Sequence, residues 1–447
     1  MHTEFTVDLS EQEYVPVHNQ GQSCQSESSP RPDGVRFATH RERLVTACAV
    51  CLWLLASRSL AADDNRPIKI VAPRALPAAD IPAERTPLGI ANDYKPWIAQ
   101  LTNGELLVVA FCFGPVEGEE GYIERAVFWR SADGGETWGE REERLDIHGR
   151  EFALNVLSDG TILMPCHFLV NDAYNQAGYT YSKLFRSTDH GANWTETRIG
   201  PEGFPDGANT ATDWTVVELP GADDLAPPVV LFGVSMQHGG EDKHEHVRLW
   251  RSTDSGETWD KSLHPDTDGW ADVDGFFSQS TTHRTRSGRL LHPVRVDRTG
   301  PHWHIAGSPE ELKEERGDNG DRMMLWESTD DGRTWRKQNG DGRFGYYGEM
   351  YPRFLQLQDG RLMLTFTVRS NSTDGYPLGV RAIFSGDDGR TWDFERDRLV
   401  ISYVNHGASG GGFGNTIQLD DGTLVSVYSY RREDEKTYVE TVRWRAP

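Results

Sequence analysis

Eight consecutive residues bring together side-chain types that nucleophilic and acid–base chemistry requires. The segment reads Tyr346-Tyr347-Gly348-Glu349-Met350-Tyr351-Pro352-Arg353. A tyrosine beside a glutamate can act as a nucleophile, and a tyrosine can also donate a proton in a lyase. Tyr347, Tyr351 and Glu349 are therefore candidate catalytic residues. The alternative is that these aromatic rings line a hydrophobic core.

Two further carboxylates, Asp93 and Asp213, lie beside apolar, strand-like segments. Cleavage of a glycosidic bond requires two carboxyl groups with different pKa values, one as the acid and one as the base or nucleophile. Asp93, Asp213 and Glu349 are the best candidates for these two roles. Each could instead accept hydrogen bonds within a turn or between strands.

Three cations are candidates for holding a carboxylate or sulfate on a substrate, because charged donors bind such groups strongly. They are Lys95, Arg295 and Arg353. The alternative for each arginine is a salt bridge between neighbouring sheets. Further candidate substrate contacts are Gln279, Phe413 and Asn415.

The histidines allow two other chemistries. His283 could serve as the base of a polysaccharide lyase. His244 and His246 are two residues apart, a spacing at which two side chains on one strand can both bind zinc. No third ligand can be named from the spacing. The sequence therefore predicts neither a metal site nor a cofactor.

A repeated turn motif indicates which strands must position these residues. Five segments match Ser-x-Asp-x-Gly-x-Thr/Asn-Trp, at residues 131–138, 187–194, 252–259, 328–335 and 385–392. The Asp can accept hydrogen bonds from its own turn, and the Gly supplies a positive φ. The Trp is expected to close the turn by packing on a neighbouring strand.

Six hairpins accompany these five turns, and they are marked by Asn-Gly, Asp-Gly and similar pairs between apolar strands, such as QLTNGELLVVAF and QLDDGTLVSVYSYR. Each unit predicts four antiparallel strands, which is one blade of a propeller. We therefore expect an all-β, six-bladed β-propeller, whose first strands bring the candidate residues to the central axis. An N-terminal strand, residues 68–71, is expected to complete blade six, since closure removes an open edge.

The repeated turns and the six hairpins resemble the sialidase (neuraminidase) superfamily, in which the turn is called an Asp box. The resemblance covers about residues 90–445 and implies a secreted, glycan-active protein with its pocket at the axis, on the face opposite the turns. It also implies three arginines that hold the substrate carboxylate, a Tyr nucleophile paired with a Glu, and an Asp acid/base.

Several of these family positions are changed in this chain. Arg295 matches the second arginine, and Lys95 stands near the first, where lysine keeps the charge but loses the bidentate fork. Gln279 stands at the Glu position and Phe413 at the Tyr position. The third arginine falls near Pro377, with Arg381 as the nearest substitute, and the acid/base loop carries Glu117, Glu119 and Glu120. Standard sialic-acid hydrolysis is therefore not expected.

Composition limits the class of partner and the compartment. The 447 residues carry a formal charge of −23, which argues against nucleic acid, because phosphate binding needs a basic face. Arginines, an apolar run at 44–56 and small residues indicate a secretory signal over 35–62, preceded by an unstructured or mis-assigned leader over 1–34. The apolar run is too short to span a membrane. The propeller would then occupy 63–447, with Cys112 and Cys166 as free thiols, in a secreted or periplasmic protein.

The sequence thus predicts a glycan-active enzyme, an exo-acting glycoside hydrolase on an acidic sugar, with a carbohydrate as its partner. A propeller-type polysaccharide lyase acting on a uronate-containing glycan and a non-catalytic carbohydrate-binding propeller remain the alternatives.

Overall fold

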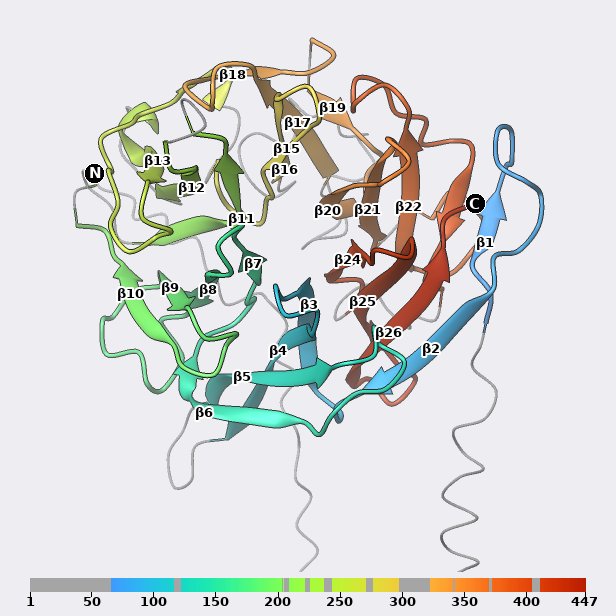
Figure 1. Cartoon of the computed structure of the whole chain (residues 1–447), viewed down its shortest axis with the longest axis horizontal. Helices are drawn as coiled ribbons and strands as arrows, with labels where there is room; N and C mark the ends of the chain where they lie inside the picture. The colour runs from blue at the N-terminus through green and yellow to red at the C-terminus, as the bar shows by residue number, and fades with distance from the viewer. Residues whose placement is uncertain are drawn as a thin grey trace, which may run out of the picture. The chain divides into compact units, whose positions relative to one another are not determined.

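Six small β-sheets surround a common axis in the computed structural model of the chain, with their first strands innermost (Figure 1). The structure describes residues 66–115, 122–202, 204, 209–221, 226–236, 243–270, 276–296, 322–340, 342–369, 372–403 and 411–447. The predicted leader and signal lie outside these residues. Pro67–Pro447 forms one compact unit. The six sheets confirm the predicted six-bladed all-β propeller.

The blades follow one another along the chain. Blade one contains β3 (Asp93–Gln100), β4 (Leu106–Pro115), β5 (Tyr122–Ser131) and β6 (Glu142–His148). Blade two contains β7 (Asn155–Val156), β8 (Ile162–Phe168), β9 (Tyr181–Ser187) and β10 (Thr195–Ile199). Blade three contains β11 (Thr210–Leu219), β12 (Val229–Met236) and β13 (Val247–Ser252), the last preceded by a short 3-10 helix, η2 (Lys243–His246).

The remaining blades are more elaborate. Blade four contains β15 (His283–Arg284), β16 (Leu290–Val296), β17 (Arg322–Ser328) and β18 (Thr334–Lys337), with β14 (Asp266–Thr267) and β19 (Arg343–Phe344) added at its edge. Blade five contains β20 (Glu349–Gln356), β21 (Leu362–Val368), β22 (Gly379–Ser385), β23 (Arg398–Val400) and β1 (Lys69–Val71). Blade six contains β24 (Gly414–Gln418), β25 (Thr423–Arg431), β26 (Thr437–Arg445) and β2 (Ala83–Leu88).

Blades three, four and five depart from the predicted four antiparallel strands. Beyond β13 the outer edge of blade three is reduced to an isolated bridge between Arg251 and Asp260. In blade four, β14 joins β18 in parallel. The segment expected to complete blade six, 68–71, instead provides β1, which pairs with β23 of blade five. The strand that pairs with β26 in blade six is β2.

All five repeated turns share one hydrogen-bond pattern. In the first, Ser131 Oγ donates to Asp133 Oδ1 at 2.8 Å, and the amides of Gly135 and Thr137 donate to Ser131 Oγ and Asp133 Oδ1 at 2.8 and 2.9 Å. The other four turns repeat these contacts. The aspartate of each turn therefore accepts hydrogen bonds from its own turn, which gives it a structural role.

The core lies between the blades and along the axis. Strands β8 and β21 are buried at every residue, because neighbouring blades cover both faces, and this explains why most of their residues are apolar. At the axis, Trp97, Trp214, Tyr351 and Phe413 from four different blades belong to one apolar cluster.

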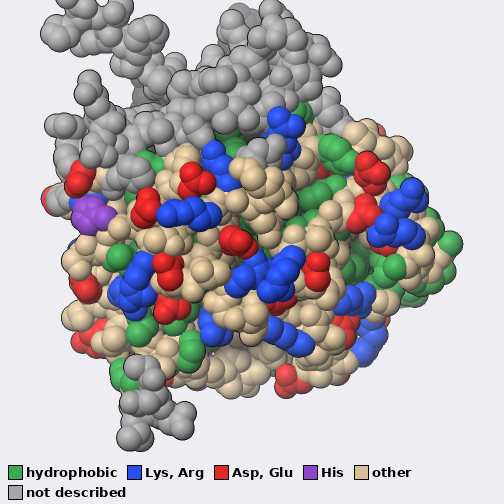
Figure 2. Space-filling view, turned by 90° about the horizontal axis from the view of Figure 1, so that it is seen from above, with side chains coloured by type: hydrophobic (Ala, Val, Ile, Leu, Met, Phe, Trp, Pro, Cys, Tyr) green, Lys and Arg blue, Asp and Glu red, His purple; other side chains and the backbone are tan. Residues whose placement is uncertain are grey.

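The outer surface is charged, and basic and acidic side chains are interspersed on the face shown in Figure 2. Of the helices among the described residues, none has the length and apolarity needed to cross a bilayer.

Candidate functional site

Four non-glycine residues with positive φ mark the beginning of the inner strands. They are Lys95 (φ 49°), Glu151 (59°), Gln279 (49°) and Tyr351 (57°), in blades one, two, four and five. Left-handed backbone at such residues costs free energy, and it clusters at ligand sites, where the surrounding structure imposes it. In blades one and five, the strained residue lies in a β-bulge, which changes the direction in which side chains project.

Two of these strained residues meet at a pair of arginines. The phenol oxygen of Tyr351 accepts hydrogen bonds from Arg369 Nη1 at 2.9 Å and Arg295 Nη1 at 3.2 Å. Arg295 Nη1 also donates to Gln279 Oε1. The rings of Tyr351 and Phe413 lie 4.1 Å apart, centroid to centroid. Two guanidinium groups from blades four and five therefore converge on one oxygen beside the axis.

The other two strained residues begin a chain of alternating charges. Lys95 Nζ pairs with Glu151 Oε1 and lies 4.1 Å from the Phe413 ring centroid, which joins this chain to the Tyr351 cluster. Arg150 Nε lies 3.9 Å from Glu151 Oε1 and 3.5 Å from Glu124 Oε1. Cation and carboxylate thus alternate from Lys95 to Glu124.

The two carboxylates of this chain have opposite pKa shifts. Burial raises the pKa of Glu124 to about 7, and Arg150 opposes this rise only in part. Burial also disfavours ionisation of Glu151, but Lys95, His167 and Arg150 outweigh it and lower the pKa to about 2. Glu124 is therefore about half protonated at neutral pH, whereas Glu151 is ionised.

Arg353 of β20 lies against two tryptophan rings of the apolar cluster at the axis. Its guanidinium lies 4.0 Å from the Trp214 ring centroid and 4.9 Å from that of Trp97, so one side chain links blades five, three and one. The side chain is buried, and burial lowers its pKa to about 9. The predicted anion contact is therefore enclosed by aromatic rings and forms part of the packed axis.

Two predicted catalytic carboxylates are occupied within their own blades. Asp93 accepts a bidentate pair of hydrogen bonds from Arg141 at 2.7 and 2.9 Å. Glu349 accepts from Arg398 Nη2 at 2.6 Å and from the Tyr346 amide at 2.9 Å. The structure therefore does not bring Asp93 and Glu349 together with the arginine pair, and each has the bonding of a structural residue.

Asp213 lies at the contact between blades three and four. Its Oδ1 accepts from Ser280 Oγ and the Trp214 amide, both at 3.1 Å, and its Oδ2 accepts from Thr282. Burial raises its pKa to about 7 against these hydrogen bonds. The carboxyl group is completely buried and joins the two blades.

The other predicted residues occupy separate positions. Tyr347 packs against Arg322, whose guanidinium lies 5.0 Å from the ring centroid. His283 lies near Phe354 and Asp388 of the fifth repeated turn, and burial lowers its pKa to about 4. Asn415 bonds both backbone groups of Ile98 in blade one, at 2.7 and 2.9 Å, and so joins blades six and one.

Some predicted residues fall outside the described chain, and others were missed. Glu117, Glu119, Glu120 and the side chain of His244 belong to the first group. Arg381, the suggested third arginine, is buried on Asp374. The structure also adds four residues to the candidate site that were not predicted as site residues from the sequence. They are Glu124, Arg150, Glu151 and Arg369. The sequence did contain a signal for Arg369, namely its position in the repeat. Arg369 directly follows β21, the second strand of blade five, and Arg295 is the penultimate residue of β16, the second strand of blade four.

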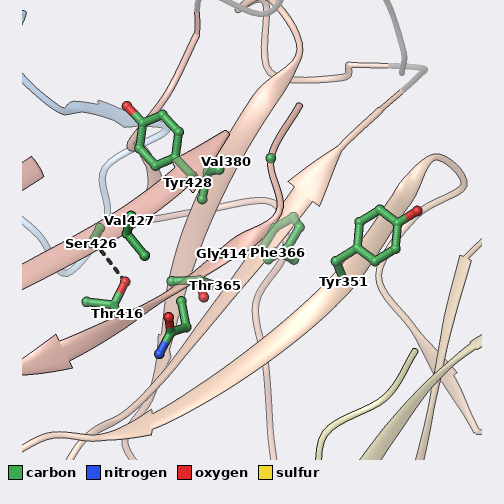
Figure 3. A pocket seen from close by; sticks show the side chains of 11 residues that line it. Tyr351, Thr365, Phe366, Val380, Gly414, Thr416, Ser426, Val427 and Tyr428 are labelled. Carbon is green, nitrogen blue, oxygen red and sulfur yellow. Dashed lines mark hydrogen bonds between the residues drawn. The ribbon is translucent and has the colours of Figure 1, made fainter. Parts of the chain in front are cut away.

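The enclosed space next to Tyr351 is too small for a sugar. It lies between blades five and six, and its wall includes Tyr351, Thr416 and Ser426 (Figure 3). The cavity measures about 10 Å³, which is room for about one water molecule. Thr416 and Ser426 share a 2.8 Å hydrogen bond there. This space is therefore not a sugar-binding pocket.

Comparison with known proteins identifies the fold. No family model and no curated protein sequence matches the chain. A solved structure of a protein of unknown function from Dyadobacter fermentans matches with 17% identity and a TM-score of 0.55, over 86% of this chain and 99% of that one. Hadza microbial sialidase Hz136 matches with 17% identity and a TM-score of 0.50, over 77% of this chain and 64% of that one. The chain therefore has the fold of these propellers.

Proposed function

We propose that this protein is a glycan-active enzyme, an exo-acting glycoside hydrolase that removes a terminal acidic sugar. The observation that carries the proposal is the convergence of Arg295 and Arg369 on the oxygen of Tyr351. Two guanidinium groups that already hold one oxygen can hold the carboxylate of a substrate, and arginine does so with directional hydrogen bonds.

Glu124 and Glu151 are proposed as the catalytic carboxyl pair, in place of the residues expected from the sequence. Glu124, whose pKa is raised to about 7, would donate its proton to the glycosidic oxygen at pH values up to about neutral, while ionised Glu151 would act as base or nucleophile. Both lie within 4 Å of Arg150 Nε, so their Oε1 atoms are less than about 8 Å apart, an upper limit that is compatible with the separation of glycosidase carboxyl pairs. Turnover should fall as the pH rises through about 7, because Glu124 then loses its proton.

The fold shared with a sialidase supports a glycan substrate, but sialic-acid hydrolysis of the standard kind is not proposed. Phe413 and Gln279 occupy the positions where the resemblance predicts a Tyr nucleophile and its Glu. A fluorogenic sialoside should therefore be cleaved slowly or not at all. Export through the segment 35–62 is proposed as well, and amino-terminal sequencing of protein recovered outside the cytoplasm would test it.

A lyase acting on a uronate is the second candidate, favoured by the position of the Tyr351 hydroxyl between two arginines. In that reaction the arginines would neutralise the uronate carboxylate, and a base would remove the proton from the adjacent carbon. The glycosidic bond would then break with formation of a carbon–carbon double bond, and the departing oxygen would take a proton from the Tyr351 hydroxyl. The product would absorb in the near ultraviolet, whereas hydrolysis adds water and yields a saturated product.

The test compares Arg369→Met with Arg361→Met on a panel of uronate-, sulfate- and sialic-acid-terminated glycans, with product mass analysis. Arg361 precedes β21 and Arg369 follows it, so the control removes the same charge from the opposite end of one strand. We expect Arg369→Met to lower kcat/KM about 10- to 100-fold, the loss of a charged hydrogen bond. Equal activity of the two variants, or no product from any glycan, would contradict the proposal.

A further inference from the structure

An exposed tyrosine lies on the loop that follows β8 in blade two. Tyr174 is 56% exposed, yet its ring stacks on His148 of β6, with centroids 4.3 Å apart and an interplanar angle of 27°. Burial lowers the pKa of His148, so the imidazole is mostly uncharged at neutral pH. The pair therefore presents an aromatic surface whose outer part faces solvent.

The loop that carries Tyr174 is held rigidly. Asn175 Nδ2 donates to three backbone carbonyls, those of Phe168, Leu169 and Tyr179, at 3.1, 2.8 and 3.0 Å. The Tyr174 amide donates to Asp172 Oδ1 at 2.9 Å. An exposed ring on a fixed backbone loses little conformational freedom when a ligand stacks on it, which favours binding.

The same aspartate connects the loop to the proposed acid. Asp172 Oδ2 accepts a hydrogen bond from the Glu124 amide at 2.8 Å, and Ala173 donates its amide to the Tyr122 carbonyl at 3.0 Å. The side chain of Asp172 is buried, so Tyr174 and Glu124 are held in a fixed relation through one residue. The loop is therefore joined directly to the main chain of Glu124.

Exposed apolar side chains concentrate in this region. Of the five exposed large hydrophobic side chains among the described residues, three lie at these ends of blades one and two. They are Phe113, Val170 and Tyr174, with 47%, 46% and 56% of their surface exposed.

We propose that Tyr174, stacked on His148, is a binding platform for a neutral pyranose ring on the leaving-group side of the scissile bond. This inference rests on the proposed function and extends it, because it makes the substrate an oligosaccharide whose acidic terminal sugar is followed by a neutral one. The apolar face of a pyranose can lie against the exposed part of the Tyr174 ring, and stacking of this kind needs no charge on the sugar.

Affinity electrophoresis of the whole protein in gels containing soluble galactan, xylan, glucomannan or mixed-linkage β-glucan tests the platform without requiring catalysis. We expect at least one polysaccharide to retard the wild type. Tyr174→Ala should raise the dissociation constant about tenfold, and Tyr174→Phe should bind as the wild type does. Ile90→Ala, which removes a side chain of similar exposure (59%), should change nothing.

Equal retardation of Tyr174→Ala and the wild type, or no retardation of the wild type in any gel, would overturn the platform. Failure of the proposed function has a different signature, namely Tyr174-dependent retardation without product from any glycan. That result would support the platform as a binding site and contradict the enzyme.

Discussion

At the scale of single residues, the site depends on two carboxyl groups whose environments differ. Glu124 is buried with one guanidinium beside it, whereas Glu151 is buried between Lys95 and Arg150. The net charge around each group, rather than burial alone, decides which one keeps its proton.

Replacement of Glu124 by glutamine should make the stability of the protein less dependent on pH. The pKa of Glu124 is raised from 4.5 to about 7 on folding, so the folded state holds the proton more tightly than the unfolded state. Wild-type stability should therefore fall as the pH rises from 4.5 through 7, by at most about 3 kcal/mol from this group. Urea unfolding at pH 5 and pH 8 should show a smaller loss for Glu124→Gln. Glu142→Gln changes an exposed carboxylate, so this control should lose as much stability between the two pH values as the wild type does. If Glu124→Gln also loses as much, the raised pKa of Glu124 is refuted.

Sequence reasoning identified several axis residues but not their partners. Lys95, Gln279, Tyr351 and Phe413 are predicted from the beginnings of the inner strands, and Arg295 from its match to the second arginine of the family. The structure brings these five residues into contact. The catalytic roles of Asp93 and Glu349 are predicted from their residue type and from their places at the beginnings of inner strands, but their arginine partners lie 48 and 49 residues away in the sequence. Without an alignment or a structure, nothing in the local sequence reveals such pairing.

At the scale of elements, the repeated turns join neighbouring blades. A Cβ on Gly332 in the fourth turn would lie 2.5 Å from Leu249 Cδ2 of blade three and 3.4 Å from the turn's own Trp335. A glycine is therefore favoured at this position for two reasons: a Cβ would be too close to Leu249, and the backbone has a φ of 77°.

Gly332→Ala and Gly104→Ala should separate these two requirements. Gly104 has a φ of 87°, but nothing lies within 4 Å of a Cβ there. We expect Gly104→Ala to cost about 1 kcal/mol of unfolding free energy from the backbone alone, and Gly332→Ala about 3 kcal/mol because overpacking adds to it. Denaturant unfolding measures both values. A Gly332→Ala cost no greater than that of Gly104→Ala would show that the contact with blade three is not constraining.

The turns also explain why the fold was predictable. Each one is stabilised within seven residues of chain, so its sequence signature is local and its repetition gives the number of blades. The pairing of β1 and β2 with the end of the chain is not local, and both segments are short and amphipathic enough to join either blade. For that reason the sequence could not assign 68–71 to its correct blade.

At the scale of the whole molecule, the structure joins the two ends of the propeller through β2 and β26. Arg85 of β2 donates to Glu440 Oε1 of β26 at 3.0 Å and to the Ile401 carbonyl of blade five at 2.6 Å. It also donates to the Tyr428 hydroxyl of β25. The side chains of Arg85 and Glu440 are 1% and 2% exposed, so this ion pair is fully desolvated.

Loss of one partner of this pair should destabilise the whole propeller. Arg85→Met leaves the Glu440 carboxylate buried without its guanidinium, at an expected cost of about 3–5 kcal/mol in guanidinium chloride unfolding. The double variant Arg85→Met/Glu440→Leu should recover part of this loss, since an apolar pair has no desolvation penalty, while the Ile401 carbonyl and the Tyr428 hydroxyl still lose Arg85 as a donor. Arg443→Met is the matched control, because Arg443 pairs with the 71% exposed Glu84 across the same two strands and should cost about 1 kcal/mol or less. If the Arg85 and Arg443 variants lose equal stability, the buried ion pair is not what holds the two ends of the chain together.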